Sequence, residues 1–183
     1  LPGLSVTLLE RLPRVGKKLL ATGNGRCNLT NMGASRAHYH GADPAFSDCA
    51  MRLYPPERIR AQFFSFGLHT RQEEDGRVYP LTDQASSVLD TLRLTAREAG
   101  VVEMCDFSLE RIRPSGGKFS LKAKDGRTFA ADRVIFATGG LASPALGGGG
   151  SGQNLLAGLG HDRIPTSPSL VPVKTDPEPI RGL

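Results

Sequence analysis

Short apolar runs and amphipathic segments follow one another along the chain, and they predict strands and helices in turn. The run Ser5-Val6-Thr7-Leu8-Leu9 predicts a strand. A first helix is expected from Pro55-Pro56 to about Phe66, because proline is well placed in a first helical turn. A second helix is expected to begin at a cap formed by Thr82 or Asp83 and to end at Gly100. One face of this second helix is apolar, with Val88, Leu92, Ala96 and Ala99.

The following part of the chain has the alternation of apolar and polar residues that is typical of strands. Val101 to Cys105 predicts one strand. Phe107 to Arg113, Lys118 to Lys124 and a third strand after the Asp125-Gly126 turn predict a small antiparallel meander. Arg133 to Ala137 is expected to be a buried strand that runs into a glycine turn. This order predicts an α/β fold with a doubly wound, Rossmann-like sheet and an antiparallel β-meander crossover.

Several segments lack a clear period. Val15 to Thr30 is predicted to be a basic and then glycine-rich loop, and Asn31 to Pro55 is expected to be irregular. The glycine run 147–152 is interpreted either as a flexible linker or as a glycine loop at a helix start. Leu155 to Gly160 predicts a short helix, and the proline-rich stretch from Pro165 to Pro179 is expected to be extended.

Composition argues against several classes of protein. The net charge of +5 comes from Lys and Arg scattered along 183 residues, with 6% aromatic residues and no Trp, so we expect no nucleic-acid partner. No apolar run approaches the roughly 20 residues of a membrane-spanning helix, so no membrane partner is expected either. Cys27, Cys49 and Cys105 lack metal-ligand spacing, and the histidines complete no ligand set. We therefore expect a protein of the reducing cytoplasm that holds no metal.

The first candidate for binding chemistry is Glu10, which ends the first predicted strand. A dinucleotide-binding fold places a carboxylate there to accept hydrogen bonds from ribose hydroxyls. The accompanying Gly-x-Gly-x-x-Gly turn belongs about 20 residues upstream and would fall before Leu1. Taken alone, Glu10 is better explained as a solvated residue at a strand end.

A second candidate is the loop from Gly16 to Asn31, which combines cations, glycines and side-chain amides. Such groups can surround a pyrophosphate and the polar edge of a planar ring system. The residues singled out for this role are Lys17, Lys18, Gly23, Asn24, Gly25, Arg26, Cys27 and Asn28.

The same loop resembles the signature of the HI0933-like flavoproteins, a bacterial family of FAD-dependent, NAD(P)H-linked oxidoreductases that includes aminoacetone oxidase and BaiN-type proteins. Further blocks resemble the family in the same order along the chain. They are Gly76 to Ala85, Ala137 to Gly140, Ser143-Pro144, Gly160-His161 and Pro168 to Pro172.

The resemblance implies FAD as cofactor, NAD(P)H as reductant and a small-molecule substrate. Family members begin with a strand and glycine turn and continue into a substrate-side domain, so the chain is expected to be truncated at both ends. Residues 1–164 would form a partial FAD-binding domain, and residues 165–183 a linker toward the substrate-side domain. The turn Thr138-Gly139-Gly140 would lie close to the cofactor, with a simple tight turn as the alternative.

Two residues of the basic loop carry competing interpretations. Arg26 is the candidate catalytic residue, because a guanidinium could stabilise negative charge on a reduced flavin or orient an anionic substrate. It could equally bond loop carbonyls. Cys27 could be a redox partner, but no second Cys lies nearby, which favours a structural thiol.

Two functions from different classes remain open on the sequence. One is an FAD-dependent oxidoreductase, and the other is a non-enzymatic nucleotide- or nucleic-acid-binding module that uses the basic loop. Bound flavin would distinguish them.

Overall fold

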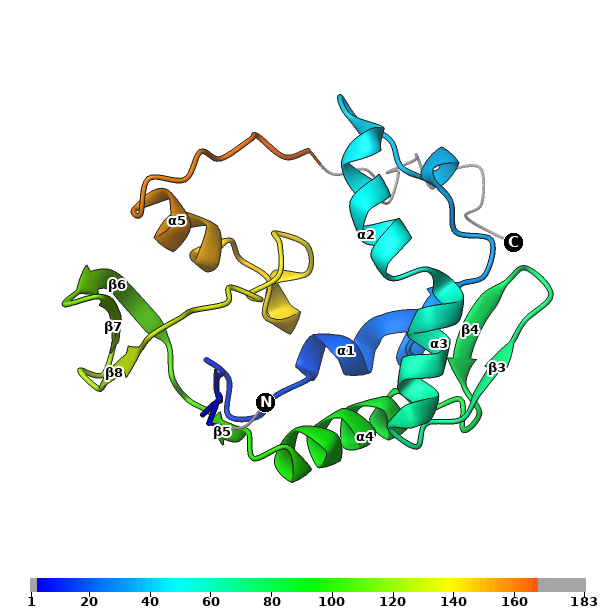
Figure 1. The fold of residues 1–183 in the computed structure, drawn as a ribbon, viewed down its shortest axis with the longest axis horizontal. Coiled ribbons are helices and arrows are strands. Elements are labelled where there is room, and N and C mark those ends of the chain that lie inside the picture. Colours follow the sequence, from blue (N-terminus) through cyan, green and yellow to red (C-terminus); the bar gives the residue numbers. More distant parts are fainter. Residues whose placement is uncertain (1–2, 168–183) are drawn as a thin grey trace, which may run out of the picture.

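The computed structural model describes residues 3–167 (Figure 1). Strand β1 (Thr7–Leu9) pairs in parallel with β5 (Val102–Met104), with Thr7 opposite Val102. Helix α4 (Ala85–Glu98) leads into β5, so the expected order of strand, helix and parallel strand is confirmed. Because a parallel pair needs a long crossover connection, this pair fixes the α/β character of the fold.

Helix α4 is anchored by its N-terminal half. Of the predicted apolar face, Val88 is buried and Leu92 and Ala96 are half-buried, but Ala99 is exposed and lies just beyond the end of the helix. Ala85, which was not predicted to be part of this face, is buried as well. The predicted cap is wrong: the residue that precedes the helix is Gln84, in an extended conformation and without a side-chain cap. Thr82 instead donates its hydroxyl to Ser87, and Asp83 has a left-handed φ of 55° and an ion pair outside the helix.

The predicted meander is present as an antiparallel sheet. Its strands are β6 (Leu109–Ser115), β7 (Lys118–Ala123) and β8 (Thr128–Ala131), in that order. Buried Ile112 lies opposite Leu121, which in turn lies opposite Phe129. One face of the meander is therefore apolar, as the period-two pattern predicts.

A second antiparallel sheet was predicted only in part. Its strands are β2 (Thr30–Asn31), β4 (Arg77–Pro80) and β3 (Thr70–Gln72), with β4 in the middle. Only 77–80 was expected to be extended. Helix α3 (Pro56–Ser65), close to its predicted bounds, contacts β2. Strand β4 is the buried centre of this sheet.

Segments expected to be irregular contain short helices. Within 15–30 the chain forms α1 (Lys17–Ala21) and the 3₁₀ turn η1 (Thr22–Gly25), so the prediction of a continuous loop is wrong. Within 31–55 it forms η2 (Arg36–His38), η3 (Pro44–Ser47) and α2 (Asp48–Leu53). Helices of three to six residues span too few turns to show a helical period.

The predicted buried strand 133–137 is also wrong. This segment has no assigned strand, and the Ile135 side chain is 91% exposed. An apolar run becomes a strand only when another strand pairs with it, and no described strand does so here. Farther along, Gly150 precedes α5 (Ser151–Ala157), so the glycine run is a loop at a helix start. The turn η4 (Pro144–Leu146) lies within that loop region.

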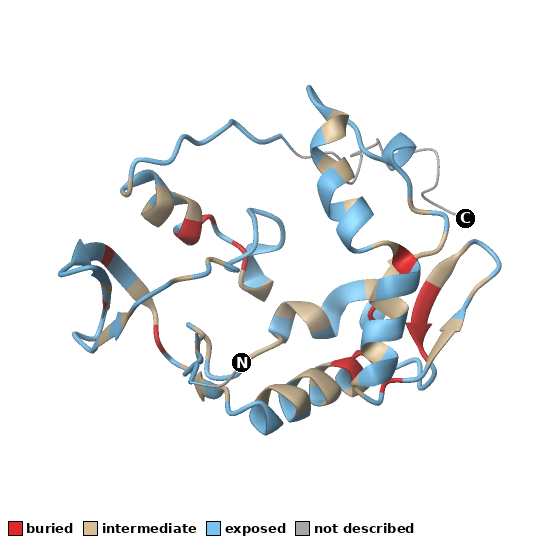
Figure 2. Ribbon diagram, in the orientation of Figure 1, coloured by how far each residue is buried: buried red, intermediate tan, exposed pale blue. Residues whose placement is uncertain are grey.

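A small core holds the described residues together. Cys27, Leu68, Ala85 and Val88 form a buried cluster, against which Phe63 and other apolar residues pack. Figure 2 shows buried residues near the junction of α3, α4 and β4, while most residues elsewhere in the chain are exposed or only half-buried. The accessible surface of 13444 Å² exceeds the roughly 8,500 Å² of a compact monomer of this mass. The chain therefore exposes more of its surface to solvent than a compact protein of the same mass.

Within residues 3–167 no helix combines the length and apolar character needed to cross a membrane. The expected linker 165–183 lies mostly outside the described residues.

Candidate functional site

The predicted binding loop is held in an unusual backbone conformation. Gly23, Asn24, Gly25 and Cys27 have positive φ values of 56°, 56°, 81° and 60°. A Cβ on Gly23 would lie 2.6 Å from the backbone nitrogen of Asn28, which is too close for any side chain. Glycine is therefore required at position 23 for the loop to fold back on itself.

Cys27 points into the protein core. It is only 6% exposed and packs in the cluster with Leu68, Ala85 and Val88. A buried thiol among apolar neighbours packs as a small hydrophobic side chain. This position favours the structural interpretation over a redox partner.

Strand β4 supports the binding loop from beneath. The backbone of Leu29 donates a hydrogen bond of 2.9 Å to the carbonyl of Val78. The buried Tyr79 ring lies 3.2 Å from the position of a Cβ on Gly23, and the Arg26 guanidinium stacks 4.0 Å from the ring centre. The block that contains Tyr79 is therefore a platform for the loop that contains Arg26.

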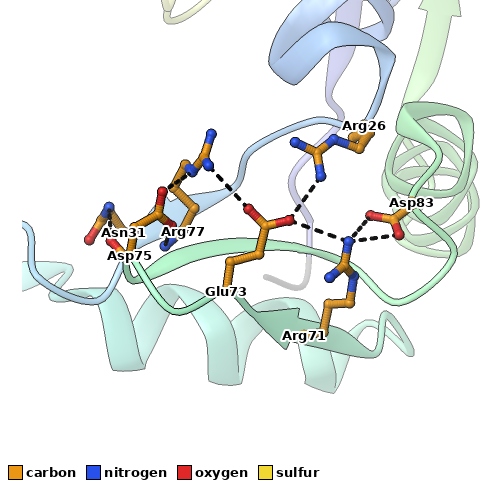
Figure 3. Close-up of polar contacts among 7 residues, drawn as sticks. All are labelled: Arg26, Asn31, Arg71, Glu73, Asp75, Arg77 and Asp83. Atoms are coloured by element: carbon orange, nitrogen blue, oxygen red, sulfur yellow. Dashed lines mark hydrogen bonds and ion pairs between the residues drawn. The ribbon is translucent and has the colours of Figure 1, made fainter.

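Arg26 also belongs to a network of charged side chains (Figure 3). Its Nη1 donates to Glu73 Oε1 at 2.9 Å. Arg71 Nη2 lies 3.4 Å from the same oxygen, and Arg77 Nη2 lies 3.4 Å from Glu73 Oε2. Glu73, in the turn between β3 and β4, thus contacts three guanidinium groups.

Two of these arginines have further carboxylate partners. Arg71 Nη2 lies 2.7 Å from Asp83 Oδ1, and Arg77 Nε lies 2.6 Å from Asp75 Oδ2. The hydrogen bond that Arg71 donates to the Asp83 carboxylate raises the pKa of the Arg71 guanidinium. The charge of Asp75 raises the pKa of Arg77 in the same way. Both arginines therefore remain protonated across the physiological range.

Asn31, on strand β2, connects that strand to the β3–β4 turn that carries the charged network. Its Nδ2 donates to the carbonyl of Asp75 at 3.1 Å, and its Oδ1 accepts from the backbone of Gly33 at 2.8 Å. A Cβ on Gly76 would lie 2.6 Å from that same Oδ1. Glycine at position 76 lets strand β2 approach the turn closely.

Glu10 lies where the sequence predicts, just beyond the end of β1. Its backbone is fixed by hydrogen bonds to Met104 and Phe107. One carboxylate oxygen, Oε1, accepts a hydrogen bond of 2.8 Å from the backbone of Leu12. The side chain is half-buried, and no described residue donates to its second oxygen.

Helix α1 brings the basic segment to the glycine loop. Lys18 Nζ donates to the carbonyl of Ala142 at 3.1 Å, and Arg11 Nη2 donates to the carbonyl of Gly148 at 3.1 Å. In Figure 1 the turn η4, within this loop region, lies beside α1 near the middle of the molecule. The loop following residue 140 is thus linked to the β1 end and to α1. Lys17 is exposed and makes no ion pair with the described residues.

The turn Thr138-Gly139-Gly140 faces open space on one side and a helix on the other. Nothing lies within 4 Å of the position of a Cβ on Gly139 or Gly140. A Cβ on Gly152 of α5, by contrast, would overlap Thr138 Oγ1. Thr138 therefore packs on α5 while the two glycines remain open.

The predicted residues fall into two groups at the two ends of the α1–η1 segment. Glu10, Lys18 and the loop after Gly140 lie toward one end, and Arg26 lies toward the other, against β4. Glu73 and Tyr79, which complete the second group, were not predicted as site residues. The resemblance of block 76–85 was the available signal for Tyr79.

The donor set fits an anionic dinucleotide. Cations are present in Lys17, Lys18 and Arg26, and Glu10 supplies an acceptor of the kind that binds ribose hydroxyls. Gly25 and the pair Gly139-Gly140 leave room for a ligand to approach the backbone.

Comparison with known proteins assigns this arrangement to a family. Residues 1–174 match the family described as HI0933-like protein Rossmann domain. The chain belongs to the HI0933-like family. The Rossmann-like fold expected from the sequence is thereby confirmed, in the form of a parallel strand pair with added antiparallel sheets.

Curated relatives of this HI0933-like chain include reductases. A 3-dehydro-bile acid delta(4,6)-reductase of Clostridium scindens is 41% identical over 175 residues, which are 96% of the chain and 42% of that relative. A ribosomal RNA dihydrouridine synthase of Haemophilus influenzae is 27% identical, covering 93% of the chain and 43% of that relative. The corresponding synthase of Escherichia coli is 25% identical, covering 93% and 42%. The chain spans less than half the length of these relatives.

Proposed function

We propose that the protein is an FAD-dependent reductase that saturates a carbon–carbon double bond conjugated to a carbonyl group, with NAD(P)H as the reductant. The observation that carries the cofactor assignment is the geometry around α1. Lys18 links this helix to the glycine loop after Gly140, and Arg11, next to Glu10 in the chain, donates to the same loop at Gly148. Cations, a ribose-type acceptor and open glycines at one place suit an anionic dinucleotide.

The predicted residues around α1 have separate roles in this proposal. Glu10 would accept hydrogen bonds from ribose hydroxyls, and Lys17 and Lys18 would neutralise phosphate charge. Gly139 and Gly140 would let the backbone lie against the cofactor. FAD supplies hydride transfer when it is bound.

The substrate class is inferred from two relatives whose names describe reductions. One acts on a 3-dehydro-bile acid with delta(4,6) unsaturation, and the other forms dihydrouridine in ribosomal RNA. A 3-oxo steroid unsaturated at these positions and a uracil ring both contain a double bond conjugated to a carbonyl group. Reduction of this bond is the chemistry common to both.

Arg26 suits one step of such a reduction. A hydride added at the β-carbon moves negative charge onto the carbonyl oxygen, and a proton added at the α-carbon completes the saturation. A fixed guanidinium near that oxygen would stabilise the developing charge. Arg26 is fixed by Glu73 and by the Tyr79 ring.

The alternative of a nucleotide- or nucleic-acid-binding module receives less support from the loop itself. Arg26 is already paired with Glu73 and lies over the Tyr79 ring. To bind the phosphates of a nucleic acid, Arg26 would have to give up these contacts. We therefore favour a small-molecule substrate.

The test uses protein loaded with FAD and reduced anaerobically with NADH or NADPH. The reduced protein is mixed with a steroid that has a conjugated enone, and the saturated ketone of the same steroid is the control. We expect the enone to reoxidise the flavin and to yield the saturated product, with no reaction of the control. Reduction of uridine in ribosomal RNA in place of the steroid would overturn the small-molecule assignment. Failure to bind FAD, or failure to reduce either substrate, would overturn the proposed reaction.

A further inference from the structure

We infer that Glu73 is a positioning residue that sets the orientation of the Arg26 guanidinium, an inference that rests on the proposed function. Arg26 is held by two contacts of different kinds. Its Nη1 donates to Glu73 Oε1 at 2.9 Å, and its planar group stacks 4.0 Å from the centre of the Tyr79 ring. The ring fixes the plane of the guanidinium, and the carboxylate fixes its rotation within that plane.

These contacts leave most of the Arg26 donors free. Among the described residues, neither Nε nor Nη2 of Arg26 has a hydrogen-bond partner. The side chain is 33% exposed, so these donors can reach a ligand. A guanidinium carries five N–H donors in a rigid, planar group. Fixing one N–H donor therefore also fixes the directions of the others.

Glu73 is itself held in place from other directions. Its side chain is only 21% exposed, and its carboxylate also contacts Arg71 and Arg77 at 3.4 Å each. Those two arginines have their own carboxylate partners in Asp83 and Asp75. The shortest contact of Glu73 is therefore the one to Arg26, with the other two arginines as its supports (Figure 3).

The arrangement differs from an ordinary surface ion pair. An isolated exposed pair contributes little because both long side chains remain mobile. Here one partner lies in the β3–β4 turn and is braced by two arginines, while the other lies on a buried aromatic ring. Such bracing gives the guanidinium a single orientation, and transition-state stabilisation requires a fixed orientation.

The test compares FAD-loaded variants of the protein. Glu73→Gln keeps the size of the side chain and removes its charge. Glu74→Gln is the matched control, because Glu74 is exposed, lies in the same turn and makes no ion pair with the described residues. We expect Glu73→Gln to lower kcat for the enone roughly tenfold or more, with KM and the Kd for FAD little changed. Glu74→Gln should behave as wild type, and Glu73→Asp, which keeps the charge, should recover part of the loss.

A double-mutant cycle separates positioning from a general structural role. If Glu73 acts through Arg26, Glu73→Gln will have no further effect on kcat in an Arg26→Gln background. A second readout is independent of turnover. The affinity for a phenolate, whose oxygen resembles an enolate oxygen in charge, should fall in Glu73→Gln and Arg26→Gln but not in Glu74→Gln.

The outcomes are distinguishable. If wild-type protein binds FAD and reduces the enone, but Glu73→Gln matches Glu74→Gln, the role of Glu73 is wrong and the proposed function stands. Fully additive effects of Glu73→Gln and Arg26→Gln would likewise overturn the positioning role. If wild-type protein binds no FAD or reduces no enone, both proposals are overturned.

Discussion

Arg26 and Cys27 are neighbours in the chain, yet their side chains enter opposite environments. Arg26 lies on the Tyr79 ring with one edge open to solvent, while Cys27 is buried in the core. The left-handed φ of 60° at Cys27 is part of the turn that separates them. One loop therefore supplies both a candidate site residue and a core residue.

The burial of Cys27 predicts a clear order of thiol reactivity. Cys49 is exposed and Cys27 is buried, so iodoacetamide should modify Cys49 well before Cys27 in the folded protein. Mass spectrometry of the peptides, with unfolded protein as the control, measures this order. Rapid modification of Cys27 in the folded state would show that the thiol is accessible, as a redox role would require.

The loop glycines should differ in their tolerance of a side chain. Gly25→Ala adds a Cβ into open space, so its only cost is that of holding alanine in a left-handed backbone conformation, about 1 kcal/mol. Gly23→Ala adds the same penalty and also forces the Cβ to within 2.6 Å of the Asn28 nitrogen. We expect the Gly23 variant to lose at least twice as much free energy of unfolding as the Gly25 variant. Equal losses in denaturant titrations would contradict the described loop geometry.

At the scale of elements, strand β4 and helix α4 form the support of the site. Tyr79 of β4 lies beneath Arg26, and Val88 of α4 packs against the core that contains Cys27. The β3–β4 turn carries Glu73. Two sequence blocks that are about 50 residues apart thus fold into one unit, held by the hydrogen bond from Leu29 to Val78 and by the contact of Arg26 with Tyr79.

The support role of α4 can be measured with a pair of substitutions on the same helix. Val88 is 1% exposed, and Val88→Ala should cost about 1–3 kcal/mol through lost burial and a residual cavity. Leu94 is 45% exposed, and Leu94→Ala should change stability by less than about 0.5 kcal/mol. A larger effect at Leu94 than at Val88 would mean that the helix buries a different face.

Sequence patterns predicted the elements that are long enough to show a period. The meander strands were predicted from their regular alternation, α4 from an apolar face with a helical period, and α3 from the proline pair at its start. Strands β2 and β3, of two and three polar residues, are too short to show a period and lack the apolar runs that indicated β1 and β5. The run 133–137 was misread because apolar composition does not supply the partner that a strand needs.

The candidate site, like the fold, could be predicted from the sequence only in part. Glycines and cations of the basic loop stood out by composition, whereas Glu73 did not. It is followed by Glu74 and Asp75 in a polar turn, where an acidic residue normally indicates only solvent exposure. Its contact with Arg26 spans 47 positions of sequence and depends on the hairpin fold.

At the scale of the whole molecule, the chain is open rather than compact. Its accessible surface is 13444 Å², about one and a half times that of a compact protein of equal mass. Exposed apolar residues include Val6, just before β1, Leu8 on β1, and Ile135 in the unpaired run 133–137. Apolar surface on this scale normally contacts other protein.

This openness predicts the dimensions of the isolated chain in solution. A compact protein of 183 residues would have a radius of gyration of about 16 Å. We expect small-angle X-ray scattering of the monomeric 183-residue chain to give a clearly larger value. A value near that of a compact protein would mean that the exposed apolar surfaces close on one another.

The central claim is that the protein binds FAD through the residues gathered around α1. The most direct test is a titration of the protein with FAD, followed by flavin fluorescence, with ADP as a competitor. We predict saturable binding that ADP weakens and that Glu10→Gln reduces roughly tenfold, through the lost hydrogen bonds to ribose. A protein that shows no saturable binding of FAD, or whose binding is unchanged in Glu10→Gln and unaffected by ADP, would contradict this account.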